Sequence, residues 1–170
     1  MDDIIELRKM KDKKQEKEER IKELKEKVKK VTDALGKKID REIRSTVVYL
    51  NALSILTTGS CQGHFRKDLV QGPFIDIGLS EPKEAKRNKE LVKKTKLLLK
   101  KFYKIKKPLR SDVKIKIRKI GIFNAIRLEP KGENKLENLS TEEKKLYIKL
   151  AQKEFKRFTK FLENEFKKDC

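Results

Sequence analysis

The chain has 170 residues, 44% of them charged and 36% hydrophobic, and its 47 Lys and Arg against 27 Asp and Glu give a net charge of +20. This length suits one domain with its own core, and a charge so far beyond the needs of solubility indicates a polyanionic partner. Two cysteines form no disulfide framework, the N-terminus lacks the pattern of a signal peptide, and the apolar stretch 47–56 is too short to cross a bilayer, so we expect a cytoplasmic protein with no membrane partner.

The first predicted element is a long charged helix over residues 1–36, followed by a single compact domain over residues 37–170. Residues 2–35 contain no Gly or Pro, and their apolar residues recur at heptad spacing, interrupted by Lys14 and Lys17. The heptad positions hold Leu7, Met10, Ile21, Leu24, Val28, Val31 and Leu35. A coiled-coil arm, an RNA-binding arm and an outer helix all fit this pattern, so an oligomer formed through the helix is one hypothesis.

A second helix is predicted from about Ile39 to Leu53, and two short strands follow it. The strands are ILTTGS (55–60) and PFIDIGL (73–79), joined by a loop that contains glycine. In the second strand Ile75 and Ile77 alternate with Phe74 and Asp76. Such alternation is typical of a strand with one buried face.

A strongly basic helix is predicted over residues 83–107, because Pro82 suits a first helical turn and Pro108 ends the pattern. Residues 81–110 hold 13 Lys and Arg against 3 Asp and Glu, whereas residues 39–80 hold 4 of each. Leu91, Thr95, Leu98, Phe102 and Ile105 form the expected inward stripe. Lysines at spacings of three and four form an outward face, for which we predict contacts with nucleic acid: Lys86, Lys89, Lys93, Lys96, Lys100 and Lys104.

A second pair of strands is predicted over residues 113–129, with a turn near Gly121. Core residues alternate there with a basic ladder, Lys114, Lys116 and Arg118, for which we also predict nucleic-acid contacts. Ser140 to Glu143 match a capping box that opens the last helix. This helix is expected to bury Leu146, Leu150, Phe158 and Phe161 or Leu162. The fold class is therefore α+β, with about four strands in two hairpin-like pairs in the order α-β-β-α-β-β-α, after the long N-terminal helix.

The loop TTGSCQGHFRK, residues 57–67, contains the single His and one of the two Cys. Cys61 and His64 supply two zinc ligands at a suitable spacing, but structural zinc takes four, and Cys170 with Asp68 or Asp76 would have to complete the set. We therefore assign no metal site. A second interpretation makes Cys61 a nucleophile activated by His64, with Asp76 orienting the imidazole, and these three are the candidate catalytic residues.

A third interpretation, which we rank first among the functional ones, is that the loop binds a substrate or phosphate. Glycine permits backbone angles that point amides at an anion, and short polar or cationic side chains surround them. The candidate substrate-binding residues are Thr58, Gly59, Ser60, Gln62, Gly63, Arg66 and Lys67. The fourth interpretation is a tight turn with a buried Cys and a satisfied His.

The segment EIRSTVVYLNALSILTTGSCQGH, with the following GPFIDI, resembles a set of small proteins that share a Thr-x-x-Ser-Cys-x-Gly-His turn. More distantly, TTGSCQGH is similar to the Thr-Ser-Ser-Cys-Ser-Gly-Arg loop of the wybutosine-synthesising tRNA methyltransferases, with His64 in place of Arg. The resemblance covers residues 42–77. It implies a small domain that acts on tRNA with S-adenosylmethionine, and a cofactor or nucleotide pocket lined by Ser60, Cys61 and Gly63.

Three functional hypotheses follow from the sequence. The first is a basic RNA-binding protein, directed to tRNA, with a nucleotide or cofactor at the 57–67 loop. RNA is preferred to DNA because lysines dominate and aromatics make up only 6%, which favours recognition of the backbone of folded RNA. The alternatives are an RNA- or nucleotide-modifying enzyme that uses Cys61 and His64, with S-adenosylmethionine implied by resemblance alone, and an assembly protein that acts through the N-terminal helix.

Overall fold

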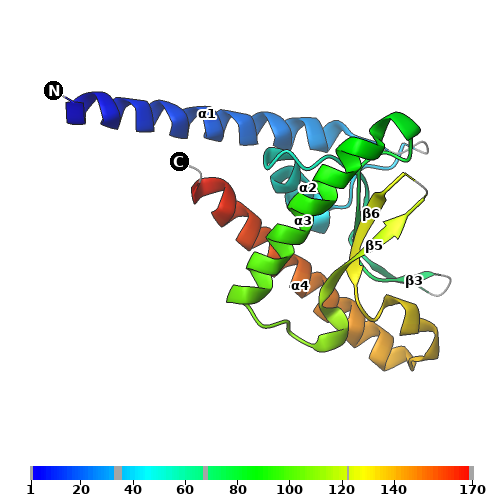
Figure 1. Ribbon diagram of the computed structural model, residues 1–170. Helices are drawn as coiled ribbons and strands as arrows, with labels where there is room; N and C mark the ends of the chain where they lie inside the picture. The colour runs from blue at the N-terminus through cyan, green and yellow to red at the C-terminus, as the bar shows by residue number, and fades with distance from the viewer. Residues whose placement is uncertain (1, 33–35, 67–68, 122, 169–170) are drawn as a thin grey trace.

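The structure is a computed structural model of the 170-residue chain, and it describes residues 2–32, 36–66, 69–121 and 123–168 (Figure 1). Four helices are α1 (Asp2–Lys30), α2 (Arg41–Ala52), α3 (Ala85–Ile105) and α4 (Thr141–Lys168). The strands are β1 (Thr57–Cys61), β2 (His64–Arg66), β3 (Leu69–Gln71), β4 (Phe74–Ile77), β5 (Ile115–Ile120) and β6 (Ala125–Pro130). Short 3-10 turns lie at Pro82–Glu84, Ser111–Val113 and Glu133–Asn138.

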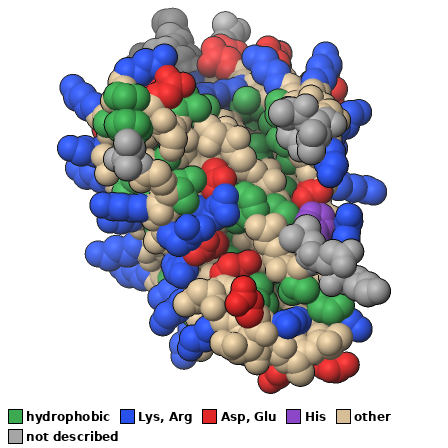
Figure 2. Space-filling view, turned by 90° about the vertical axis from the view of Figure 1, so that its right-hand side faces the viewer, with side chains coloured by type: hydrophobic (Ala, Val, Ile, Leu, Met, Phe, Trp, Pro, Cys, Tyr) green, Lys and Arg blue, Asp and Glu red, His purple; other side chains and the backbone are tan. Residues whose placement is uncertain are grey.

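A four-stranded antiparallel sheet in the order β1-β4-β6-β5 forms the centre of the fold, which confirms the predicted α+β class. The predicted alternation holds on β4, where Ile75 and Ile77 are buried and Asp76 lies on the opposite face. The helices α2, α3 and α4 all pack on the face that carries Ile75 and Ile77, and no α-helix of the described residues covers the other face (Figure 1). Figure 2 looks onto this uncovered side.

The core lies between the sheet and three helices and contains a cluster of aromatic rings. Phe102 of α3 packs against Phe158 and Phe161 of α4, with ring centroids 5.3 and 5.5 Å apart. Phe102 and Phe158 are completely buried. Burial of such side chains stabilises the fold by about 1.5–3 kcal/mol each, which makes this cluster a major source of stability.

The second half of α1 packs on α2, while its first half extends away from the domain (Figure 1). Val28 is buried with Val47 and Val48, and Ile21 and Leu24 lie against the same cluster. Among the described residues, no helix combines the length and apolar character needed to span a membrane.

Several local predictions differ from the structure. The region between the first two predicted strands is not an open loop, because β2 and β3 pair as an antiparallel hairpin within it. Ile105 is 60% exposed because it is the last residue of α3, and Leu146 is 49% exposed because its neighbour Tyr147 occupies the inward position of α4. The capping box is confirmed, since Ser140 N–H donates to Glu143 and Glu143 N–H donates to the Ser140 hydroxyl.

Candidate functional site

The turn between β1 and β2 brings together side chains from three segments. Asp40 immediately precedes α2, Cys61 is the last residue of β1, and His64 is the first of β2. His64 Nε2 lies 3.4 Å from Asp40 Oδ2, and the ligand atoms of all three residues lie within 4.8 Å of one another. The structure thus joins the predicted Cys61 and His64 pair, and the carboxylate beside it is that of Asp40.

Asp76, predicted to orient His64, is engaged elsewhere. It faces Arg127 across the β4–β6 ladder, and the two form a bidentate ion pair with distances of 2.6 and 2.8 Å. The guanidinium also stacks over the Phe74 ring, 3.7 Å from its centroid. Strand register explains this placement, because Asp76 and Arg127 are direct cross-strand neighbours on the uncovered face of the sheet.

The backbone amides of the turn are occupied by protein atoms. Gln62 N–H donates to Asp40 Oδ2 at 3.0 Å, and Gly63 N–H donates to Cys61 Sγ at 3.4 Å. The Gln152 side chain of α4 donates to the carbonyls of both turn residues. The amides of Gln62 and Gly63, which were predicted to bind an anion, thus already donate to protein atoms.

Burial governs the reactivity of Cys61, whose exposed fraction is only 8%. Desolvation raises the pKa of its thiol, and the Gly63 amide opposes this effect only in part, while the charges of Asp40 and Glu133 add to it. The thiol is consequently protonated at neutral pH in the protein alone. This environment does not activate Cys61 as a free nucleophile.

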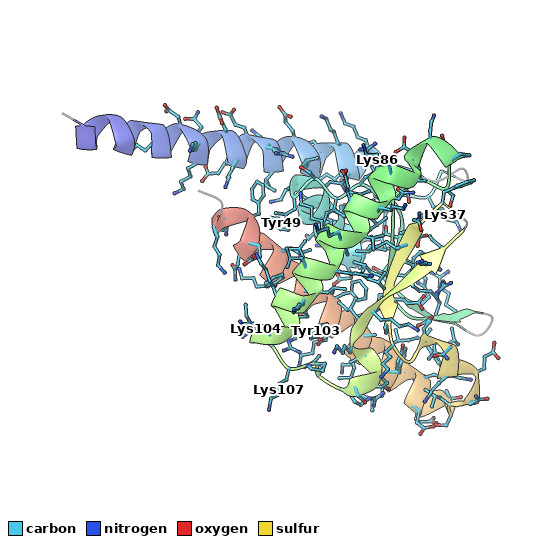
Figure 3. The ribbon with its side chains drawn as sticks, in the orientation of Figure 1. Lys37, Tyr49, Lys86, Tyr103, Lys104 and Lys107 are labelled. Carbon is cyan, nitrogen blue, oxygen red and sulfur yellow. The ribbon has the colours of Figure 1, made fainter. Side chains whose placement is uncertain are left out.

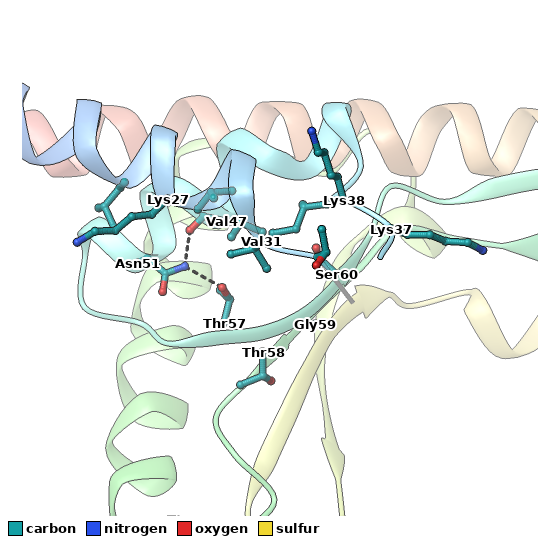
Figure 4. A pocket seen from close by; sticks show the side chains of 14 residues that line it. Lys27, Val31, Lys37, Lys38, Val47, Asn51, Thr57, Thr58, Gly59 and Ser60 are labelled. Carbon is teal, nitrogen blue, oxygen red and sulfur yellow. Dashed lines mark hydrogen bonds between the residues drawn. The ribbon is translucent and has the colours of Figure 1, made fainter. Parts of the chain in front are cut away.

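The first half of the predicted loop lines a cavity of about 330 Å³ between α1, α2 and β1 (Figure 4). Val28, Val31 and Val47 form an apolar wall, and Thr58, Gly59 and Ser60 lie along the strand side. Figure 4 places Lys27, Lys37 and Lys38 around the rim, with side chains that extend away from its centre. The predicted binding residues are thus split between this cavity and the Cys61 turn. Arg66 lies exposed at the end of β2, and Lys67 falls outside the described residues.

All six lysines of the predicted face of α3 are exposed. Its six lysines, Lys86 to Lys104, lie within a sector of about 80° at 100° per residue, opposite the buried stripe. Figure 3 labels Lys86 near one end of the helix and Lys104 near the other. Within the described part of the chain, none of the six forms an ion pair with an acidic side chain.

Two of the three residues of the predicted basic ladder on β5 share one acidic partner. Glu129 of β6 is 4% exposed and pairs with both Lys116 and Arg118, at 3.4 and 2.9 Å. Lys114 precedes β5, and its ammonium lies over the Tyr103 ring. The ladder therefore keeps a net positive charge, although two of its three cations are paired with a carboxylate of the neighbouring strand.

Asp40 and the rim lysines of the cavity were not predicted from the sequence. Asp40 directly precedes a helix, a position at which an Asp side chain normally caps the helix. The sequence therefore indicates a capping role for Asp40. Instead the side chain of Asp40 makes no cap hydrogen bond, and Glu42 N–H of the helix donates to the Gln62 side chain. Only the tertiary structure shows that the Asp40 carboxylate is directed to the Cys61 turn.

Comparison of the chain with protein-family models, curated proteins and solved structures found no match in any of the three. The geometry and charge of these surfaces therefore carry the functional argument.

Proposed function

We propose that the protein binds RNA through the lysine face of α3. The observation that carries this proposal is the row of six exposed lysines without acidic partners in the described structure. Some other basic side chains of the described residues, among them Lys101, Lys116 and Arg118, are paired with carboxylates, so the α3 face is distinguished by six lysines without such partners in one row. An ammonium group without an acidic partner gains the most binding free energy from a phosphate. It breaks no ion pair within the protein when it binds, and only counterions are released.

Folded RNA suits this face better than an unpaired strand. Lys86 and Lys104 are 18 residues apart, and at 1.5 Å per residue the face extends over about 27 Å. Lysines contact phosphates without reading base edges, and the face itself contains no aromatic ring for base stacking. The expected mode is therefore recognition of a phosphate backbone.

The cavity beside β1 is proposed to receive one nucleotide of that RNA. Its volume lies at the lower end of the range of ligand pockets. An apolar wall suits a base or sugar, and Lys27 and Lys38 at the rim suit a phosphate that lies outside the cavity. The resemblance of the TTGSCQGH segment to a family that acts on tRNA supports tRNA as the first RNA to test.

The test compares two variants of equal charge by fluorescence anisotropy with labelled tRNA. One variant replaces Lys89, Lys93, Lys96 and Lys100 of α3 by Gln. The matched control replaces Lys131, Lys135, Lys149 and Lys153, which are exposed and lie outside α3. Both lose four positive charges, so any difference between them reflects position.

We expect the α3 variant to bind tRNA more weakly than the wild type and with a smaller dependence of affinity on salt concentration. Each lost phosphate contact lowers the log–log salt slope by about 0.7–0.9, which corresponds to about five- to eightfold in affinity at ~0.1 M salt. Two lost contacts thus reduce affinity by at least about 25-fold. The control keeps near wild-type affinity, because charges distant from the RNA are screened. Equal losses in both variants would contradict the proposal, and tighter binding to duplex DNA than to tRNA would assign the face to DNA.

A further inference from the structure

We propose that Asp40, Cys61 and His64 bind a divalent transition-metal ion, Zn²⁺ in the first instance. The three residues offer a carboxylate, a thiolate and an imidazole, which are the ligand types that zinc takes in proteins. They come from a segment before α2, from β1 and from β2, so the fold and not the sequence spacing assembles them. This inference does not rest on the RNA-binding proposal.

The distances fit tetrahedral zinc. Bonds of about 2.0–2.1 Å to nitrogen and oxygen and 2.3 Å to sulfur place ligand atoms roughly 3.3–3.6 Å apart. His64 Nε2 and Asp40 Oδ2 are 3.4 Å apart, and no pair in the cluster exceeds 4.8 Å. Closure around an ion therefore requires side-chain movements of only about 1 Å.

Two backbone amides already stabilise the atoms that would bind the metal. Gly63 N–H donates to Cys61 Sγ, and Gln62 N–H donates to Asp40 Oδ2. Hydrogen bonds of this kind orient ligands and stabilise their anionic forms. The Gln62 side chain also accepts from the Glu42 amide at the start of α2, and the Asp40 side chain makes no cap hydrogen bond there.

The conformation of the turn depends on glycine. Gly63 has φ +86°, and a Cβ there would lie 2.9 Å from the Pro73 nitrogen. The turn is thus packed against β3 and β4 and holds Cys61 and His64 at a fixed separation. A rigid arrangement of this kind lowers the entropic cost of metal binding.

Three protein ligands leave one coordination position open. Open positions are typical of zinc that binds water or a substrate oxygen, whereas structural zinc is enclosed by four protein ligands. The side chains of His64 and Asp40 are 20% and 29% exposed, so the cluster is reached from solvent. When the metal binds, the Cys61 thiol loses its proton to solvent and the sulfur bonds to the ion. The negative charges of the thiolate and the carboxylate together balance the charge of the ion.

The test is titration of the 170-residue protein with Co²⁺ after treatment with a chelator. A cobalt–thiolate bond gives a charge-transfer absorption, and Zn²⁺ should abolish it by competition. We expect one Co²⁺ per chain with this band. Absence of the band from the wild-type protein overturns the proposal.

Variants assign the ligands. Cys61→Ser should remove the thiolate band, while Cys170→Ser, which removes the other thiol, should retain it with unchanged affinity. Asp40→Asn and His64→Gln should each weaken Zn²⁺ binding by more than the about 10- to 100-fold that loss of a supporting hydrogen bond costs. Circular dichroism of each chelated variant checks that it is folded. The band surviving in Cys61→Ser, or wild-type affinity in a folded Asp40→Asn or His64→Gln variant, overturns the assignment.

Discussion

Replacement of Gly63 by Ala should destabilise the protein through two separable effects. Gly63 has φ +86°, a conformation that costs an L-residue about 1 kcal/mol, and the new Cβ would lie 2.9 Å from the Pro73 nitrogen and 3.1 Å from the Gln71 carbonyl. Relief of such crowding costs a further ~1–3 kcal/mol, because these contacts are with backbone atoms that do not swing aside. We therefore expect a loss of about 2–4 kcal/mol in the free energy of unfolding.

Gly36→Ala is the matched control. Its φ of +73° is similar, but a Cβ there would meet no atom of the described residues within 4 Å, so only the backbone cost of about 1 kcal/mol applies. Urea denaturation of the metal-free proteins measures the free energy of unfolding of both variants. With a slope of about 2 kcal/mol per M, the midpoint should fall by about 1–2 M for Gly63→Ala and about 0.5 M for Gly36→Ala. Equal midpoints for the two variants would refute the reasoning that the Cys61 turn is sterically locked.

Three further changes test the packing and electrostatics of the fold. Phe158→Ala removes a fully buried ring of the aromatic cluster and should lower the free energy of unfolding by about 3–5 kcal/mol; a loss under 1 kcal/mol in urea would be inconsistent with this core. A double-mutant cycle on Asp76→Asn and Arg127→Gln should give a coupling energy of about 1–3 kcal/mol, and a value near zero would argue against the bidentate pair. Burial raises the pKa of Glu133 above 4.5, so its neutral form contributes stability that is lost as the pH rises through the folded pKa. The free energy of unfolding of the wild type relative to Glu133→Gln should accordingly fall from pH 4.5 towards neutrality, and a constant difference would show that Glu133 is not responsible.

Elements with strong local signals could be predicted from the sequence. Period, caps and proline positions defined α2, α3 and α4, and the exposed lysines of α3 follow from helix geometry alone. The β2–β3 hairpin could not be predicted this way. Each of its strands has only three residues, so no alternation develops within them.

The sites depended on contacts between distant segments. Asp40 is 21 residues before Cys61, and nothing in the local sequence indicates that it, and not Asp76, lies beside His64. The basic ladder of β5 appeared free because its acidic partner, Glu129, is on another strand and was not paired with it. Charge patterns within one helix could therefore be predicted, while charge pairs across strands required the sheet register.

Lysine footprinting tests the central claim most directly. The protein is acetylated briefly with and without excess tRNA, and the modification of each lysine is quantified by mass spectrometry. The account predicts that Lys86, Lys89, Lys93, Lys96, Lys100 and Lys104 are protected by RNA, while Lys131, Lys135, Lys149 and Lys153 react at unchanged rates. Uniform protection of all lysines, or protection confined to residues outside α3, would contradict it.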